Sequence, residues 1–137
     1  MKKREVAGLI ILSSDNRVLL QHRDDNPLIG DPNRWCLWGG GFKEGETPLQ
    51  ALQRELLEEL QIGLHNPKLI IHKTIVDKYA ENDFYVFLHP QEWDLEYLRQ
   101  HQQEGQGLGL FGREELDNLD IVKPAMEVLL DFFDKNY

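Results

Sequence analysis

The order of apolar and polar residues in the first third of the chain predicts strands joined by turns. The segments Glu5–Leu12 and Arg17–Arg23 are rich in aliphatic and β-branched residues and flank the turn-forming sequence SSDN, which predicts a β-hairpin. Asp24–Asn33 contains two prolines, a glycine and three aspartates, a composition typical of a surface loop. The apolar residues Trp35–Trp38 then predict a short buried strand.

The second half of the chain predicts two more strands and two helices. We expect strands at Leu69–Val76 and Phe84–Leu88, a short helix at Arg113–Leu119 and a terminal helix after Pro124. On the terminal helix, the apolar face is predicted to contain Val128, Leu129, Phe132 and Phe133. The tract 92–107 stays unassigned, since 93–99 is compatible with a helical turn and 100–106 has the composition of a mobile loop. The whole pattern is that of an α/β (α+β) fold.

The central helix is predicted most sharply, because its start carries several local signals. Thr47 is a good N-cap, Pro48 suits the first helical position and Gln50 completes a Thr-x-x-Gln capping box. At about 100° per residue, one side of the helix gathers leucines and the adjoining arc gathers glutamates. The leucines are Leu49, Leu52, Leu56, Leu57 and Leu60, and the glutamates are Glu55, Glu58 and Glu59. We therefore expect one packed face and one anionic face.

The glutamate-rich face requires a physical reason, because carboxylates three and four residues apart on a helix repel one another. A solvated helix face is the usual fate of such a run. Here, however, the glycines at 39–41 precede the helix and allow the backbone to approach a ligand closely. Hard divalent cations such as Mg²⁺ are held by carboxylates together with substrate phosphates. Metal binding is therefore the favoured interpretation.

Composition and charge exclude several classes of protein. The 137 residues suit a single domain, 1–137, and Asp and Glu outnumber Lys and Arg by 24 to 15, giving a formal charge of −9. This balance argues against a nucleic acid polymer as partner. Cys36 is the single cysteine, which makes an internal disulfide impossible. We find no apolar run near the roughly 20 residues of a membrane span and no leader segment, so we expect no membrane association and a cytoplasmic location.

The glycines do not form a phosphate-binding P-loop. That motif requires lysine and serine or threonine directly after its last glycine, whereas Gly45 is followed by Glu46 and Thr47. The dinucleotide-binding pattern G-x-G-x-x-G is absent as well. The five histidines lack zinc-ligand spacing, so no zinc site is predicted.

Residues 40–62 read G-x5-E-x7-R-E-L-x-E-E-L-Q-I, and this segment resembles the Nudix box of the MutT-like hydrolase family. Gln61 stands where the family has glycine, and Trp38 stands where a proline is common just before the box. The resemblance implies a Nudix-type α/β/α sandwich with a mixed β-sheet over a single domain, 1–137. It also implies hydrolysis of the pyrophosphate linkage in a nucleoside diphosphate derivative, dependent on Mg²⁺ or Mn²⁺.

A catalytically silent nucleotide-binding module with the same fold is the alternative, although Glu55, Glu58 and Glu59 are all present. The implied partner is a small-molecule nucleotide, such as a nucleoside triphosphate or a nucleotide sugar. The sequence leaves the oligomeric state open, with a homodimer, the commonest closed assembly, as one alternative.

The resemblance assigns roles residue by residue. Glu58 and Glu59 are similar to the principal metal ligands, Glu55 to the ligand or general base, Gly39 to a carbonyl ligand and Arg54 to the arginine that orients a catalytic glutamate. Glu46 matches a supporting glutamate of the box. Glu104 resembles a further metal ligand or base that comes from a distant loop, with Glu92 as the other candidate. Arg23 and Lys43 are expected to contact substrate phosphates, and Tyr79 resembles a tyrosine of relatives that cleave dinucleoside polyphosphates.

Overall fold

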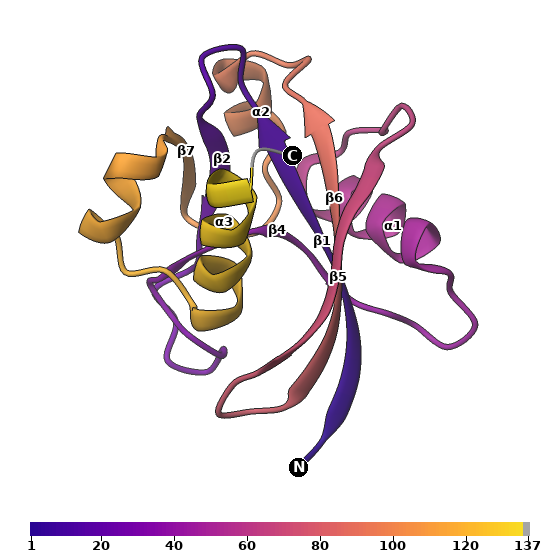
Figure 1. Cartoon of the computed structure of the whole chain (residues 1–137). Coiled ribbons are helices and arrows are strands. Elements are labelled where there is room, and N and C mark those ends of the chain that lie inside the picture. The colour runs from indigo at the N-terminus through magenta and orange to yellow at the C-terminus, as the bar shows by residue number, and fades with distance from the viewer. Residues whose placement is uncertain (136–137) are drawn as a thin grey trace.

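A mixed β-sheet with helices on both faces forms the centre of the molecule in the computed structural model, which describes residues 1–135 (Figure 1). The strands are β1 (Lys3–Leu12), β2 (Val18–His22), β3 (Trp35–Cys36), β4 (Trp38–Gly41), β5 (Lys68–Val76), β6 (Glu81–Pro90) and β7 (Gly107–Phe111). The helices are α1 (Pro48–Leu60), α2 (Leu95–His101), the 3₁₀ helix η1 (Arg113–Asn118) and α3 (Lys123–Lys135). The α/β/α sandwich expected from the sequence is confirmed.

Strand β1 lies at the centre of the sheet. Its residues 7–11 are buried on both faces, which agrees with the apolar run AGLII. It pairs parallel with β6 along its whole length and antiparallel with β4. The predicted hairpin is therefore right in its turn and wrong in its extent. Strands β1 and β2 are antiparallel, but their pairing is limited to Leu12 and Val18, after which β2 pairs with β3 and β7.

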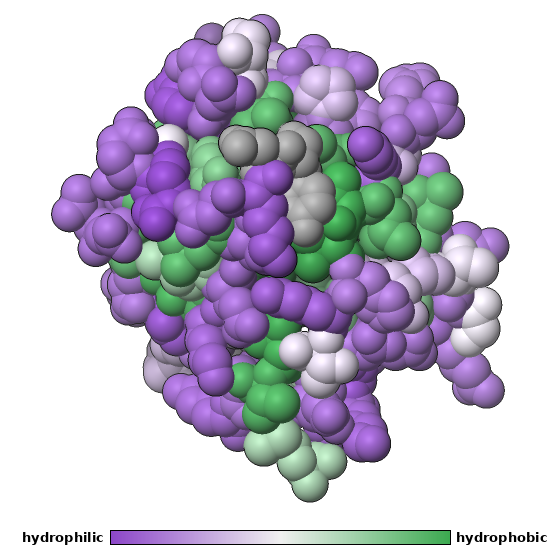
Figure 2. Space-filling model, viewed as in Figure 1, coloured by the Kyte–Doolittle hydropathy of each residue, from purple (hydrophilic) through white to green (hydrophobic). Residues whose placement is uncertain are grey.

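Two apolar clusters fill the space between the sheet and its helices. One cluster joins α1 and α2 to the sheet through residues such as Leu9, Leu52 and Leu98. The other joins α3 and η1 to the opposite face through residues such as Ile10 and Leu129. Figure 2 shows that hydrophilic residues cover most of one face of the molecule, with hydrophobic ones exposed mainly toward its middle. None of the helices in the described part of the chain has the length and apolarity that a membrane span needs.

Helix α1 begins as predicted. Thr47 caps it, the capping box with Gln50 is complete and Pro48 occupies the first turn. The helix ends at Leu60, and the φ of 56° at its C-cap Gln61 lies in the left-handed region. The glycine of the family pattern is therefore replaced at a position where glycine is the least strained residue.

The predicted division of α1 into a leucine face and a glutamate face is partly wrong. Leu49 and Leu57 are 38% and 60% exposed, whereas Glu59 is only 3% exposed. Leu57 lies about 140° around the helix from Leu52, while Glu59 lies within about 20° of Leu52. One carboxylate of the cluster is therefore buried against the sheet, where its charge is costly.

Two other stretches differ from the prediction. The expected strand Trp35–Trp38 is divided at Leu37 into β3, which pairs with β2, and β4, which pairs with β1. The unassigned tract 92–107 contains α2, then a loop at 102–106, and leads into β7. Sequence pattern did not reveal β7 because two of its five residues are glycines.

Candidate active site

Two glycines of β4 allow close packing, Gly39 against β1 and Gly40 against α1. Gly39 has a φ of +126°, and a Cβ atom there would lie 2.0 Å from the Ala7 carbonyl oxygen. A Cβ atom on Gly40 would lie 2.7 Å from the Glu55 carboxylate. The absence of side chains therefore lets Glu55 lie directly over the strand. It also allows the Gly39 amide to donate to Glu59 Oε1 at 2.8 Å.

Arg54 is the main counter-charge of the glutamate cluster. Its guanidinium forms a two-pronged contact with Glu46, at 2.7 Å and 2.9 Å. It also contacts Glu55 at 2.9 Å, Glu58 at 3.4 Å and the Gly41 carbonyl at 3.0 Å. The hydrogen bond from Arg54 is the largest cause that lowers the pKa of Glu46 to about 2. Glu46 therefore keeps its charge at any ordinary pH and holds Arg54 beside Glu55.

Glu59 is buried and Glu55 is partly buried, and their pKa values shift in the opposite direction to that of Glu46. Burial raises the pKa of Glu59 well above its usual value, the Gly39 amide opposes the rise, and the nearby charges of Glu55, Glu104 and Glu58 add to it. Burial also raises the pKa of Glu55, which Arg54 opposes and Glu58 and Glu104 reinforce. The negative charges of these carboxylates repel one another, and this repulsion contributes to the raised pKa values of Glu55 and Glu59. A cation placed among them would relieve the repulsion.

Glu104 reaches the same place from a distant part of the chain. It lies in the loop 102–106, and it lines a pocket of about 350 Å³ together with Glu55 and Glu59. Glu92, the other candidate for this role, is exposed and does not line the pocket. Of the two carboxylates considered from sequence, the structure brings only Glu104 to the cluster.

The oxygen-rich donor set fits a hard divalent cation in its chemistry. The candidate donors are the carboxylates of Glu55, Glu58, Glu59 and Glu104 and the carbonyl of Gly39. Among residues 1–135, the side chains as placed include no group of three acidic, histidine or cysteine residues that surrounds a common point. Arg54 pairs with Glu55 and Glu58, and the Gly39 amide holds Glu59. In this arrangement, protein groups supply the counter-charges.

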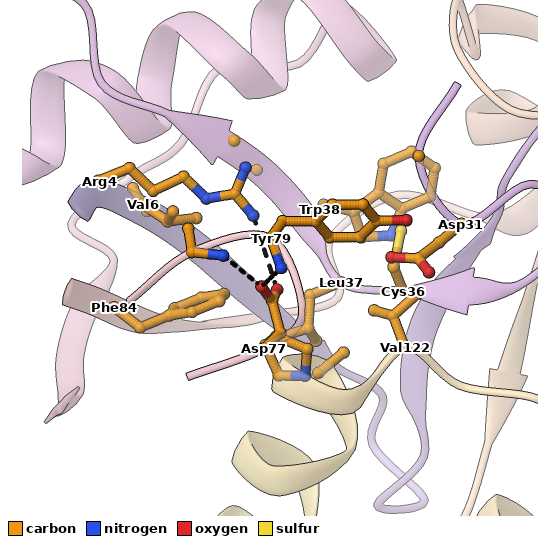
Figure 3. A pocket seen from close by; sticks show the side chains of 18 of the residues that line it. Arg4, Val6, Asp31, Cys36, Leu37, Trp38, Asp77, Tyr79, Phe84 and Val122 are labelled. Carbon is orange, nitrogen blue, oxygen red and sulfur yellow. Dashed lines mark hydrogen bonds and ion pairs between the residues drawn. The ribbon is translucent and has the colours of Figure 1, made fainter. Parts of the chain in front are cut away.

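A second, larger pocket of about 650 Å³ adjoins the first and shares Arg23, Cys36, Leu37 and Gly39 with it. Figure 3 shows the Arg4 guanidinium and the Asp77 carboxylate facing each other at its edge, where they form an ion pair at 3.7 Å. Tyr79 and Phe84 contribute aromatic rings to its lining. The pocket thus combines flat apolar surface with a few fixed polar groups, which is typical of small-molecule sites.

Known proteins share the sequence pattern and the fold of this chain. A family model described as NUDIX domain matches residues 2–132. The chain belongs to the NUDIX family. One curated relative is an RNA pyrophosphohydrolase from Rickettsia bellii, which is 33% identical over 100 residues that cover 73% of this chain and 56% of that protein. Another is an RNA pyrophosphohydrolase from Mesorhizobium japonicum, which is 41% identical over 59 residues that cover 41% of this chain and 34% of that protein. The chain spans about half the length of the first of these relatives.

Solved structures share the fold of this NUDIX chain. The MutT protein from Methanosarcina mazei Go1 has a TM-score of 0.78 at 17% identity, covering 98% of this chain and 94% of that one. The MutT NUDIX hydrolase from Burkholderia pseudomallei has a TM-score of 0.74 at 23% identity, covering 94% and 97%. The NUDIX domain of Shewanella oneidensis NrtR, complexed with ADP ribose, has a TM-score of 0.77 at 11% identity, covering 100% and 90%.

The three residues predicted to bind substrate are placed differently. Arg23 lines both pockets of the NUDIX fold, and its Nε donates to the carbonyls of Gly30 and Asp31 at 3.0 Å and 3.2 Å. Tyr79 lines the larger pocket and is 46% exposed. Lys43 lines neither pocket and is exposed in the loop before α1.

The larger pocket is also lined by Arg4 and Asp77, to which the sequence pattern gave no role, and by Phe84. Arg4, Asp77 and Phe84 come from β1, from the turn between β5 and β6, and from β6. Only the parallel pairing of β1 with β6 brings these residues together. That pairing joins distant segments and leaves no local signal in the sequence.

Proposed function

We propose that this NUDIX domain hydrolyses the pyrophosphate linkage of a nucleoside diphosphate derivative, with Mg²⁺ or Mn²⁺ as cofactor. The observation that carries the proposal is the convergence of Glu55, Glu59 and Glu104 in one pocket that adjoins a larger, partly aromatic pocket. A pyrophosphate substrate requires both features. Its diphosphate needs compensating charge, and its nucleoside needs a surface on which to bind.

In this proposal Glu58, Glu59, Glu55 and Glu104, with the Gly39 carbonyl, hold the cation. When bound, the cation supplies the positive charge that an acidic protein needs to bring a diphosphate close. Arg23 lies at the junction of the two pockets, where its guanidinium contacts a phosphate oxygen.

The chemical step is a water attack on phosphorus. The water oxygen forms a bond to phosphorus, and the bridging phosphorus–oxygen bond breaks and leaves its electron pair on the departing phosphate. The water proton passes to a carboxylate oxygen of Glu55 or Glu104, both of which line the smaller pocket. Arg54 contacts Glu55 at 2.9 Å and orients it for this role.

The nucleoside binds in the larger pocket, with a base against the rings of Tyr79 or Phe84. The Arg4 side chain is held in place, because its Nε donates to Asn82 Oδ1 and its guanidinium forms an ion pair with Asp77. Asp77 is itself held by the amides of Tyr79 and Ala80 at 2.8 Å and 2.9 Å. These polar groups are therefore pre-organised to read a substrate.

We further propose that the substrate is a small nucleotide. The formal charge of −9 disfavours an extended polyanion. Relatives that are named RNA pyrophosphohydrolases make the 5′-triphosphate end of a short RNA the most informative competitor. Both substrate types present the same phosphate chain to the carboxylate cluster, so only a direct comparison separates them.

The experiment is a substrate panel with separation of the products. Nucleoside triphosphates, nucleotide sugars, ADP-ribose, dinucleoside polyphosphates and a short 5′-triphosphorylated RNA are incubated with the protein, with and without Mg²⁺. We expect metal-dependent cleavage of one class and a loss of about 100-fold or more in turnover for Glu58→Gln. Glu44→Gln, an exposed glutamate of the loop before α1, is the matched control. If neither wild type nor Glu58→Gln cleaves any compound of the panel, the result would support the non-catalytic binding module instead.

A further inference from the structure

The backbone of Glu104 is held by two side-chain amides. Gln21 Nε2 donates to the Glu104 carbonyl oxygen at 2.9 Å, and Gln102 Nε2 donates to the same oxygen at 2.8 Å. Gln102 also reaches the Gly107 carbonyl at 2.8 Å and so bridges both ends of the loop. Two donors on one carbonyl fix the orientation of this peptide, and with it the position from which the Glu104 side chain extends.

Gln21 is the rigid member of this pair. It lies on β2, is only 4% exposed and lines the pocket that contains Glu55, Glu59 and Glu104. Its Oε1 accepts from the Cys36 thiol at 3.4 Å, so both ends of the amide are satisfied. Burial raises the pKa of the Cys36 thiol to about 11, which keeps the S–H proton available as the donor. A buried and fully hydrogen-bonded amide has little freedom to move.

Other contacts of the loop 102–106 follow the same plan. The Gln103 amide donates to the Glu59 carbonyl at 2.7 Å and ties the loop to α1. The Gln106 amide donates to the His22 carbonyl at 2.8 Å and ties it to β2. Gly105 has a φ of +89°, and a Cβ atom there would lie 2.7 Å from the His22 carbonyl oxygen. The loop is thus seated closely on the sheet beside Glu104.

We propose that Gln21, supported by Gln102, is a positioning residue that holds the Glu104 carboxylate at the cluster formed by Glu55 and Glu59. This inference rests on the proposed hydrolase function, in which Glu104 acts as metal ligand or base. A loop gives less precise placement than a strand or helix, and a catalytic group displaced by about 1 Å loses about 100-fold in rate. The amide of Gln21 transfers the rigidity of β2 to that loop.

The first test is kinetic. Gln21→Leu and Gln102→Ala each remove a donor to Glu104, and we expect turnover to fall about 10- to 100-fold with KM little changed. Gln103→Ala is the matched control, because its side chain donates to the His101 carbonyl and its backbone amide is kept. Gln102 is only partly buried, so Gln102→Ala removes a donor without opening the core. Wild-type turnover in both variants would overturn the proposal.

A double-mutant cycle separates positioning from general destabilisation. If Gln21 acts through Glu104, Gln21→Leu has little further effect on turnover in a Glu104→Gln background. Multiplicative losses would mean that Gln21 acts elsewhere, which would refute the inference. Full activity of Glu104→Gln beside an inactive Glu58→Gln would also refute it while leaving the hydrolase function intact.

A second readout needs no substrate. In protein labelled with carbon-13 at glutamate, bound Mn²⁺ broadens the signals of nearby carboxyl carbons, and Glu104→Gln identifies the signal of Glu104. We expect the Glu104 signal to broaden strongly in wild type and in Gln103→Ala. In Gln21→Leu and Gln102→Ala we expect the same signal to broaden only weakly. If the panel reveals no substrate, the proposed function fails, and this measurement alone decides the placement of Glu104. Equal broadening in all four proteins would overturn the inference.

Discussion

The replacement Glu59→Gln tests the energetic cost of placing a carboxylate under α1. Glu59 is 3% exposed, and burial raises its pKa well above the usual value. Between the unfolded and the folded pKa, the folded protein binds a proton at Glu59 that the unfolded chain does not. The stability that this proton gives is complete below the unfolded pKa and is lost as the pH rises through the folded pKa.

The magnitude follows from one proton. Within that window the free energy of unfolding of the metal-free protein falls by about 1.4 kcal/mol per pH unit because of Glu59 alone. In Glu59→Gln, the amide oxygen still accepts from Gly39 and no charge forms, so this contribution disappears. The variant is therefore expected to be more stable than wild type above the window, and the gap closes as the pH falls toward the unfolded pKa.

Urea denaturation followed by tryptophan fluorescence, in EDTA and between about pH 5 and 8, measures this difference. The charge of Glu55 adds to the raised pKa of Glu59, so the difference between the two proteins includes the coupling of this pair. Glu44→Gln serves again as the exposed control. If wild type and Glu59→Gln show the same pH dependence, Glu59 is charged in the folded protein and the burial argument is wrong.

Three further predictions follow from single residues. Gln61→Gly removes strain at a φ of 56° and should raise the free energy of unfolding by about 0.5–1 kcal/mol, measured by urea denaturation. Gly39→Ala should lower it by about 3 kcal/mol or more in the same assay, because the new Cβ meets the Ala7 carbonyl at 2.0 Å. Arg4→Ala should raise KM about tenfold with little change in kcat, measured by steady-state kinetics on the cleaved substrate.

The sequence predicted best those features that depend on neighbouring residues. The start of α1 was correct because Thr47, Pro48 and Gln50 act within one turn. The first strand was predicted because its apolar run has no polar interruption, but its central place in the sheet was not, although residues 7–11 are buried on both faces. Of the glutamates in the box, Glu55 and Glu59 line the smaller pocket, whereas Glu46 and Glu58 do not.

Features that depend on distant pairing were not predictable. The exposed Leu57 and the buried Glu59 exchange the roles that hydrophobicity assigns, since the position of the sheet decides which arc of α1 is covered. The larger pocket is lined by residues that are distant in the sequence, such as Arg4 on β1 and Asp77 after β5, which form an ion pair. Gln21 is a polar residue on a buried strand, and its partner Glu104 lies 83 positions later.

The structure explains how the glutamates of α1 coexist when protein groups alone supply the counter-charges. Arg54 pairs with Glu46, Glu55 and Glu58 at the surface side of the cluster and offsets part of their combined charge, and burial favours a proton on Glu59 at the sheet side. A divalent cation offers the same relief from repulsion, so proton and cation are alternative partners for one carboxylate. The buried position of Glu59 therefore weakens the folded protein at high pH, and in the proposed function it would make Glu59 a ligand of the cation. Arg54 is tied to Glu46 by two hydrogen bonds, so it would keep one partner if a cation replaced it at Glu55 and Glu58.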